Sequence, residues 1–195
     1  GPFYYKDKLY SPALRSDRVN QKRLAYFWQA DMDGSHVEQI AEIATSSLGN
    51  EEGTVVLGEP YSTVLSDGTF VTVFRVAMDG YMRISFSHDQ GKTWSVPEKT
   101  AVRGYPQHLL RLKDNRLLVT YGYRFHPYGI RACLSNDGGK TWNTQNEIII
   151  RDGGTSDDLG YPTSIELEAG KILTVYYYNS QERPDPYIEG AIYKL

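Results

Sequence analysis

The sequence predicts an all-β protein built from repeated antiparallel sheets of four strands, and three observations carry this prediction. The 195 residues include 18 Gly, 9 Pro and 16 Tyr, which favours many strands joined by tight turns. An octapeptide occurs twice, and a longer segment that opens with Gly-x-Pro occurs three times. Repeats of about 20 to 50 residues are typical of folds that stack one supersecondary unit several times.

The two octapeptides are Ser-His-Asp-Gln-Gly-Lys-Thr-Trp at 87–94 and Ser-Asn-Asp-Gly-Gly-Lys-Thr-Trp at 135–142, so they begin 48 residues apart. Four short strands with their turns need about this length. The Asp can accept hydrogen bonds from turn N–H groups and the Thr hydroxyl, Gly permits a positive φ, and Trp packs on a neighbouring strand. We therefore expect structural turns, formed by Ser87, Asp89, Gly91, Thr93 and Trp94 and by Ser135, Asp137, Gly139, Thr141 and Trp142.

The Gly-x-Pro repeat predicts the remaining strands. Residues 58–74 align without gaps on 160–176, and residues 104–121 repeat the pattern with one residue shifted. Each copy predicts a strand, a tight turn and a second strand of β-branched and aromatic residues. The turns are Asp67-Gly68, Asp114-Asn115 and Ala169-Gly170. A third strand then leads into the octapeptide, and a fourth strand follows it.

These repeats divide one domain, residues 1–195, into blade-like units at 1–57, 58–103, 104–159 and 160–195. In the first unit, residues 4–13 predict two strands around Lys6-Asp7-Lys8, residues 24–30 predict a third, and Met32-Asp33-Gly34 is a decayed octapeptide. The stretch from Val37 to Ala44 also fits a helical period, so strand and helix both stay open there. The last unit has a third strand at 188–195 and no fourth.

The pattern Ser-x-Asp-x-Gly-x-Thr-Trp, in register with the Gly-x-Pro repeat, resembles the Asp box of the sialidases (neuraminidases), a family with BNR repeats. The likeness covers essentially the whole chain. The resemblance implies a β-propeller of six blades, of which about four are present here. It also implies that missing N-terminal blades complete the ring, and we expect the four blades to cover an arc rather than a closed ring.

Strand direction predicts which side chains share one end of the blades. The first strand of each unit runs from one face of the blade, here called face X, to the opposite face, Y. The second strand is antiparallel to the first, so the end of the second strand lies beside the start of the first strand at face X. The side chains placed there are Glu59, Tyr105 and Tyr161 at strand starts and Arg75, Arg124 and His126 at or just past strand ends. An acid, phenols and guanidinium groups together suit an anionic ligand.

The resemblance implies roles for these residues. Sialidases use a Tyr nucleophile assisted by a Glu, an Asp acid and three arginines that bind the substrate carboxylate. Tyr161 resembles the nucleophile, Glu59 resembles its partner and Arg75 resembles the second arginine. The third arginine departs from the family, because its spacing falls near Pro127, so either Arg124 or Arg131 substitutes or the carboxylate site is altered. The first arginine and the Asp acid belong to the missing blades.

Structural roles compete with these assignments. Tyr105 and Tyr161 recur in the repeat, so each can simply pack against the Pro that follows it. Arg131 occupies the same repeat position as Arg83, which favours a structural role. His126 is a common kind of polar loop residue. The spacing of Asp152, Asp157 and Asp158 matches no calcium loop, so we expect no metal and no cofactor.

The sequence therefore predicts a retaining exo-glycosidase of sialidase type that removes terminal sialic acid or a related acidic sugar from glycans. The alternative is a non-catalytic propeller that binds glycans or a protein partner, because Asp boxes mark the fold alone. A net charge of −3 does not favour nucleic acid as a partner. The apolar runs are too short to span a membrane, and Cys133 stands alone. A glycan substrate suggests secretion or a periplasmic location.

Overall fold

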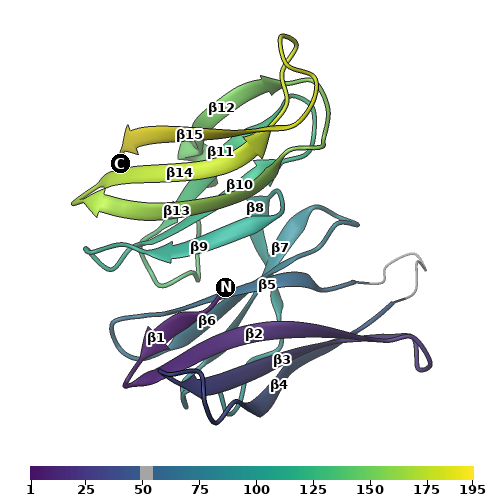
Figure 1. The fold of residues 1–195 in the computed structure, drawn as a ribbon, viewed down its shortest axis with the longest axis vertical. Helices are drawn as coiled ribbons and strands as arrows, with labels where there is room; N and C mark the ends of the chain where they lie inside the picture. The colour runs from purple at the N-terminus through teal and green to yellow at the C-terminus, as the bar shows by residue number, and fades with distance from the viewer. Residues whose placement is uncertain (49–54) are drawn as a thin grey trace. The chain divides into compact units, whose positions relative to one another are not determined.

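The computed structural model describes residues 1–48 and 55–195 (Figure 1). Its strands form four antiparallel sheets, three with four strands and one with three, which confirms the predicted all-β class. Two compact units divide the chain, the first comprising residues 1–79 and 83–99 and the second residues 80–82 and 100–195. Within the described residues, no helix is long and apolar enough to cross a membrane.

The first sheet comprises β1 (Phe3–Tyr5), β2 (Lys8–Asp17), β3 (Lys22–Asp31) and β4 (Glu38–Ser47), in that order. The helical alternative for residues 37–44 is wrong, because β4 is a strand. It pairs with β3 through two bulges, which leave Ile40 and Ile43 as the extra residues. A bulge adds one residue to the usual alternation, so two bulges in succession gave the apolar residues a helix-like spacing.

The second sheet comprises β5 (Gly58–Val64), β6 (Phe70–Arg75), β7 (Tyr81–Ser87) and β8 (Glu98–Arg103). Asp67 and Gly68 form the turn between β5 and β6, with Gly68 at φ 88° and the Asp67 carboxylate accepting the Thr69 N–H at 2.9 Å. The first octapeptide connects β7 to β8. Both positions agree with the sequence prediction.

The second unit contains two further sheets (Figure 1). One has the order β12-β11-β10-β9, and the other has the order β13-β14-β15. Asn115 and Gly170, at the predicted turns, adopt φ of 70° and 72°. The elements are β9 (Gln107–Arg111), β10 (Leu117–Tyr123), β11 (Tyr128–Ser135), η1 (Thr144–Asn146), β12 (Ile148–Gly154), β13 (Gly160–Glu168), β14 (Lys171–Tyr178) and β15 (Tyr187–Lys194).

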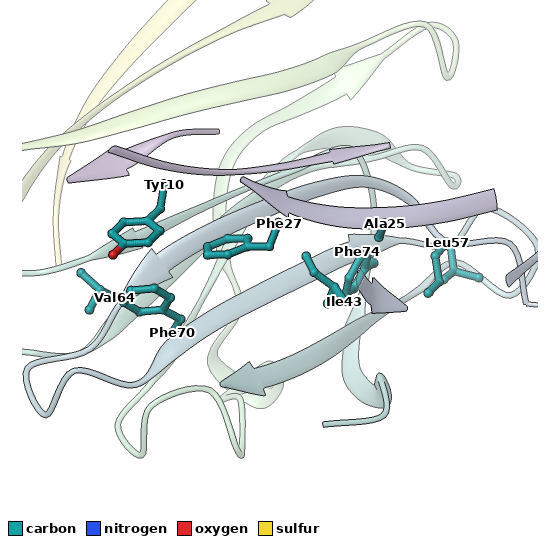
Figure 2. Close-up of a cluster of buried hydrophobic side chains, with 9 residues drawn as sticks. Tyr10, Ala25, Phe27, Ile43, Leu57, Val64, Phe70 and Phe74 are labelled. Carbon is teal, nitrogen blue, oxygen red and sulfur yellow. The ribbon is translucent and has the colours of Figure 1, made fainter. Parts of the chain in front are cut away.

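Aromatic side chains join the two sheets of the first unit. Figure 2 shows Tyr10, Phe27, Val64 and Phe70 at one end of this buried cluster. The ring centroids of Phe27 and Phe70 lie 5.8 Å apart, and both side chains have no exposed surface. Full burial of one Phe contributes about 1.5 to 3 kcal/mol, so this cluster is a main source of stability for the unit.

Hydroxyl pairs link the first two strands of the repeats. Ser62 and Thr72 face each other across β5 and β6 with their oxygens 2.6 Å apart, and Ser164 and Thr174 do the same at 2.8 Å. In β9 the corresponding position holds His108, which is opposite Thr120. Burial lowers the pKa of His108 to about 4. One repeat therefore carries a buried imidazole where the others carry a hydroxyl.

Both octapeptides form the same hydrogen-bonded turn. The Asp89 carboxylate accepts the Thr93 N–H at 2.9 Å, the Thr93 hydroxyl at 2.7 Å and the Ser87 hydroxyl at 2.8 Å. Asp137 receives the equivalent bonds from Thr141 and Ser135. Hydrogen bonds from Thr93 lower the pKa of Asp89 to about 2.

Gly91 and Trp94 connect the first octapeptide to the core of its unit. Gly91 adopts φ 86°, and a Cβ there would lie 2.4 Å from the Phe27 ring, so no larger residue fits. The Trp94 indole N–H donates to the Gly91 carbonyl at 2.9 Å, and its ring centroid lies 4.9 Å from that of Phe27. The turn therefore packs directly against the aromatic cluster.

We predict that Asp89→Ala destabilises the protein by about 1 to 3 kcal/mol at pH 7, because it removes charge-assisted hydrogen bonds from the turn. The folded-state pKa lies below the ordinary value of 3.8, so this stabilisation is complete above pH 3.8 and disappears as the pH falls towards 2. Urea unfolding at pH 7 and pH 2.5 measures both effects. Asp185→Ala, at an exposed loop position, is the control. An equal loss at both pH values would contradict the prediction.

We predict that His108 makes the protein less stable in acid. The unfolded chain binds a proton at this residue below about pH 6.5, whereas the folded chain does so only near pH 4. Stability therefore falls with pH in this window, by roughly 2 to 3 kcal/mol between pH 7 and pH 4.5. His108→Ser, which restores the hydroxyl of the other repeats, should remove most of that fall in urea titrations. The exposed His126→Ser serves as the comparison, and an unchanged pH dependence in His108→Ser would disprove the assignment.

Candidate active site

The first strands β5 and β13 begin with the same backbone irregularity. Gly58 pairs with Arg75 and Gly160 with Tyr177, and a bulge then follows in each strand. The first bulge residues, Glu59 and Tyr161, have φ of 40° and 46°. Side chains other than Gly rarely adopt this left-handed conformation, and such strain is concentrated at functional sites. The fold therefore presents an acid in one unit and a phenol in the other from the same kind of backbone.

Glu59 and Arg75 form an ion pair in the first unit. Arg75 Nη1 donates to Glu59 Oε1 at 2.9 Å, and the two side chains are 23% and 36% exposed, in that order. The pairing of the β5 start with the β6 end confirms the strand-direction argument within this unit. An exposed edge on both groups leaves them accessible to a ligand.

A hollow of about 290 Å³ adjoins this ion pair. Its lining includes a second guanidinium, that of Arg23 at the start of β3, which the sequence analysis missed. A Cβ placed on Gly58 would lie 3.8 Å from Arg23 Nη1 and 3.8 Å from the Arg75 Cβ, so Arg23 approaches the same end of β5 and β6. The lining residues are Arg23, Val56, Gly58, Glu59, Arg75, Ala77 and Met78.

Tyr161 is exposed, with 53% of its surface accessible. Its ring stacks on Tyr177, with centroids 6.1 Å apart and an interplanar angle of 27°. The Arg124 guanidinium carbon lies 5.9 Å from the Tyr161 ring centroid. An exposed phenol held at a strand start is accessible to a ligand and can serve as a nucleophile.

Arg124 is held by a hydrogen-bond network that the sequence did not predict. Its Nη2 donates to the Tyr177 hydroxyl at 2.6 Å, and its Nε donates to the Leu159 carbonyl at 2.9 Å. Tyr177 in turn donates to Asp158 at 2.9 Å. Burial, helped by the bond to Asp158, raises the pKa of Tyr177 to about 12, so this phenol stays protonated and orients Arg124.

Arg131 is engaged inside its own sheet. Its Nη1 donates to Glu147 at 2.6 Å, its guanidinium carbon lies 3.8 Å from the Tyr123 ring centroid, and its side chain is 12% exposed. Arg83, at the equivalent repeat position, pairs with Asp79 at 2.8 Å. The shared pattern supports the structural alternative, and a substrate-binding role for Arg131 stays a prediction.

Tyr105 and His126 lie among other aromatic rings of the second unit. Tyr105 packs edge to face on Phe125, with centroids 5.9 Å apart, and Arg103 lies 3.9 Å from the same Phe125 ring. His126 packs on Tyr128 at 5.8 Å. The substrate-binding roles of both residues stay predictions.

Across the described ranges, no group of three or more His, Cys, Asp or Glu side chains is placed to hold a metal ion. Cys133 is fully buried beside the Tyr121 hydroxyl, and burial raises its pKa to about 11. A thiol in this environment is inert as a nucleophile, because only the thiolate reacts readily.

The repeats, the sheets and these strand starts define a protein of the BNR-repeat class. The BNR repeat-like domain family matches residues 5–175, so the chain belongs to this family. A comparison with curated proteins finds no match.

Solved structures share the fold. A protein of unknown function from Dyadobacter fermentans DSM 18053 aligns over 100% of this chain and 52% of its own, with 30% identity and a TM-score of 0.87. A Hadza microbial sialidase aligns over 95% of this chain and 42% of its own, with 14% identity and a TM-score of 0.63. An α-L-arabinofuranosidase of Fusarium graminearum covers 98% and 73%, with 13% identity and a TM-score of 0.65.

These likenesses establish a β-propeller fold of the kind found in glycoside hydrolases. The chain spans about half the length of the Dyadobacter protein. Glu59 and Arg75 belong to the first unit, and Tyr105, Arg124, His126, Arg131 and Tyr161 belong to the second.

Proposed function

We propose that the protein is an exo-glycosidase of sialidase type, which removes sialic acid or a related acidic sugar from the end of a glycan with retention of configuration. The observation that carries the proposal is Tyr161, an exposed phenol on a left-handed strand start beside Arg124. A neutral phenol is the appropriate nucleophile for an anomeric carbon that bears a carboxylate, because an anionic nucleophile would be repelled. The sialidase among the similar structures supports this class of substrate.

The remaining residues of the site have separate roles in this proposal. Arg75 binds the substrate carboxylate through charge-assisted hydrogen bonds, and Glu59, its ion-pair partner, fixes the direction of the guanidinium. Arg124 keeps a positive charge beside the Tyr161 ring, while Tyr177 and Asp158 hold it in place. The acid that protonates the leaving group lies outside this set.

A non-catalytic glycan-binding propeller is the second candidate, and one observation favours it. Of the arginines proposed for the carboxylate, Arg124 donates to Leu159 and Tyr177, and Arg131 donates to Glu147. A glycan-binding module can have arginines that are engaged in hydrogen bonds within the protein. Such a module has to bind its ligand, but it does not have to stabilise the charge of a transition state. Turnover is the property that separates the two candidates.

We predict that the full-length gene product hydrolyses a fluorogenic sialoside and that Tyr161→Phe lowers kcat at least about a hundredfold, because it removes only the nucleophilic oxygen. Tyr4→Phe is the matched control, since Tyr4 and Tyr161 are both 53% exposed. Thermal unfolding confirms that both variants fold. Folded wild-type protein that turns over no sialoside would support the binding module instead, and a Tyr161→Phe enzyme of normal activity would exclude this nucleophile.

We also propose that further blades of the gene product complete the propeller against the last sheet. Ile165, Leu173 and Ile192 form one cross-strand row on β13, β14 and β15. Ile165, Ile192 and the nearby Ile188 are 52%, 62% and 74% exposed. Apolar surface in such a row normally marks an interface.

We also propose that the protein acts outside the cytoplasm, because its proposed substrate is a glycan.

The substitution Ile192→Lys tests whether another blade covers this face of the last sheet. In the 195-residue chain the substitution should reduce binding of a hydrophobic dye and leave the free energy of unfolding nearly unchanged. In the full-length protein it should destabilise by about 2 kcal/mol or more, because a charge is then buried. Val19→Lys is the control at an exposed turn, where Val19 is 91% exposed. Equal tolerance of Ile192→Lys in both proteins would rule out coverage of this face.

A further inference from the structure

The connection between β12 and β13 closes around one buried side chain, the amide of Asn179. We propose that Asn179 is a positioning residue, which holds Arg124 and Tyr161 in place through the loop 155–159. This inference deepens the proposed function and rests on it for the role of Tyr161. Asn179 directly follows β14 and is 1% exposed, so it acts through its neighbours and not on a substrate.

The amide of Asn179 holds the loop at both ends. Its Oδ1 accepts the Thr155 N–H at 2.8 Å, the Thr155 hydroxyl at 2.8 Å and the Ser156 N–H at 3.1 Å. Its Nδ2 donates to the Ser156 hydroxyl oxygen at 3.0 Å and to the Asp158 carbonyl at 2.7 Å. An Asn side chain offers one acceptor oxygen and two donor hydrogens, and this loop uses all of them. A buried polar network satisfied in this way makes the backbone around it rigid.

The far end of this loop carries the groups that hold the candidate site. The Asp158 side chain accepts the Tyr177 hydroxyl at 2.9 Å. The next carbonyl, that of Leu159, accepts Arg124 Nε at 2.9 Å. Tyr161 follows two residues later with its left-handed φ of 46°. A shift of the backbone at residue 158 therefore displaces both the acceptor of Arg124 and the strand start that presents Tyr161.

Apolar packing does little to fix this loop. Thr155, Asp157 and Asp158 are exposed, and the first fully buried apolar side chain is that of Leu159. The order of the loop therefore depends on the hydrogen bonds that Asn179 makes. Displacement of a reacting group by about 1 Å can lower a rate about a hundredfold, so loss of these bonds affects catalysis as well as stability.

Steady-state kinetics of the full-length protein with a fluorogenic sialoside tests the consequence for turnover. Asn179→Leu, which keeps the volume and removes the hydrogen bonds, should lower kcat about tenfold or more and change KM far less. Asn179→Asp should lower kcat in the same direction, because it loses the donor to the Asp158 carbonyl. This second variant carries the test if thermal unfolding shows that Asn179→Leu does not fold.

Asp137→Ala is the matched control for a purely structural loss. Asp137 accepts hydrogen bonds from Ser135 and Thr141 in a turn that follows β11, whereas Arg124 precedes β11. The substitution should lower the melting temperature and leave kcat unchanged. An equal loss of kcat in Asp137→Ala and the Asn179 variants would overturn the inference, because general destabilisation would then explain both.

Hydrogen exchange of the Arg124 Nε–H tests the positioning without any need for turnover. Nuclear magnetic resonance of protein with ¹⁵N-labelled arginine reports this group, and Arg124→Lys assigns its signal. Exchange should be about tenfold or more faster in the Asn179 variants and unchanged in Asp137→Ala, because the bond to the Leu159 carbonyl protects it.

The outcomes distinguish this inference from the proposed function. Wild-type exchange at Arg124 in a folded Asn179 variant, or wild-type kcat in that variant, would overturn the role of Asn179. Faster exchange at Arg124 in a protein whose wild type turns over no sialoside would sustain the positioning role and disprove the hydrolase.

Discussion

A β-sheet of this fold can bury both of its faces only if another sheet packs against each, and the rest of the structure depends on this constraint. In the first unit the ring of Phe27 on β3 meets that of Phe70 on β6, and neither retains any exposed surface. In the second unit the Thr120 hydroxyl on β10 lies 3.0 Å from the Ser164 hydroxyl on β13. Each repeat is therefore stabilised by residues of a different repeat, and stability is shared between neighbours as in other repeat proteins.

Packing of this kind leaves the strand starts free for chemistry. The cores lie along the middle of the strands, so a bulge at Glu59 or Tyr161 disturbs only the first residues of the ladder. Strand pairing that resumes after each bulge holds the residue with the left-handed backbone in place. Binding residues can consequently sit on a rigid frame rather than on a long loop, which favours accurate placement of guanidinium and phenol groups.

The sequence predicted what depends on local hydrogen bonding and missed what depends on packing between repeats. The strands and turns after each Gly-x-Pro were predictable, because residues such as Asp67 and Gly68 have intrinsic turn preferences. The strand β4 was ambiguous, since the bulges at Ile40 and Ile43 hide the alternation of a strand. Glu59 and Arg75 were correctly placed together, because antiparallel pairing alone brings them side by side. Arg23 was not predictable, because it lies in the degenerate first repeat and its approach to Gly58 depends on packing between the two sheets of the first unit.

The likeness of the two bulged strand starts has a consequence for how this fold acquires new activities. One backbone shape accepts a carboxylic acid at residue 59 and a phenol at residue 161, and the glycine before each pairs with Arg75 and Tyr177 respectively. The same bulged backbone thus carries two chemically different side chains. A point substitution at such a strand start can therefore exchange one reactive group for another without changes to the core. Duplicated blades thus offer several equivalent positions for different catalytic groups, both in evolution and in laboratory libraries.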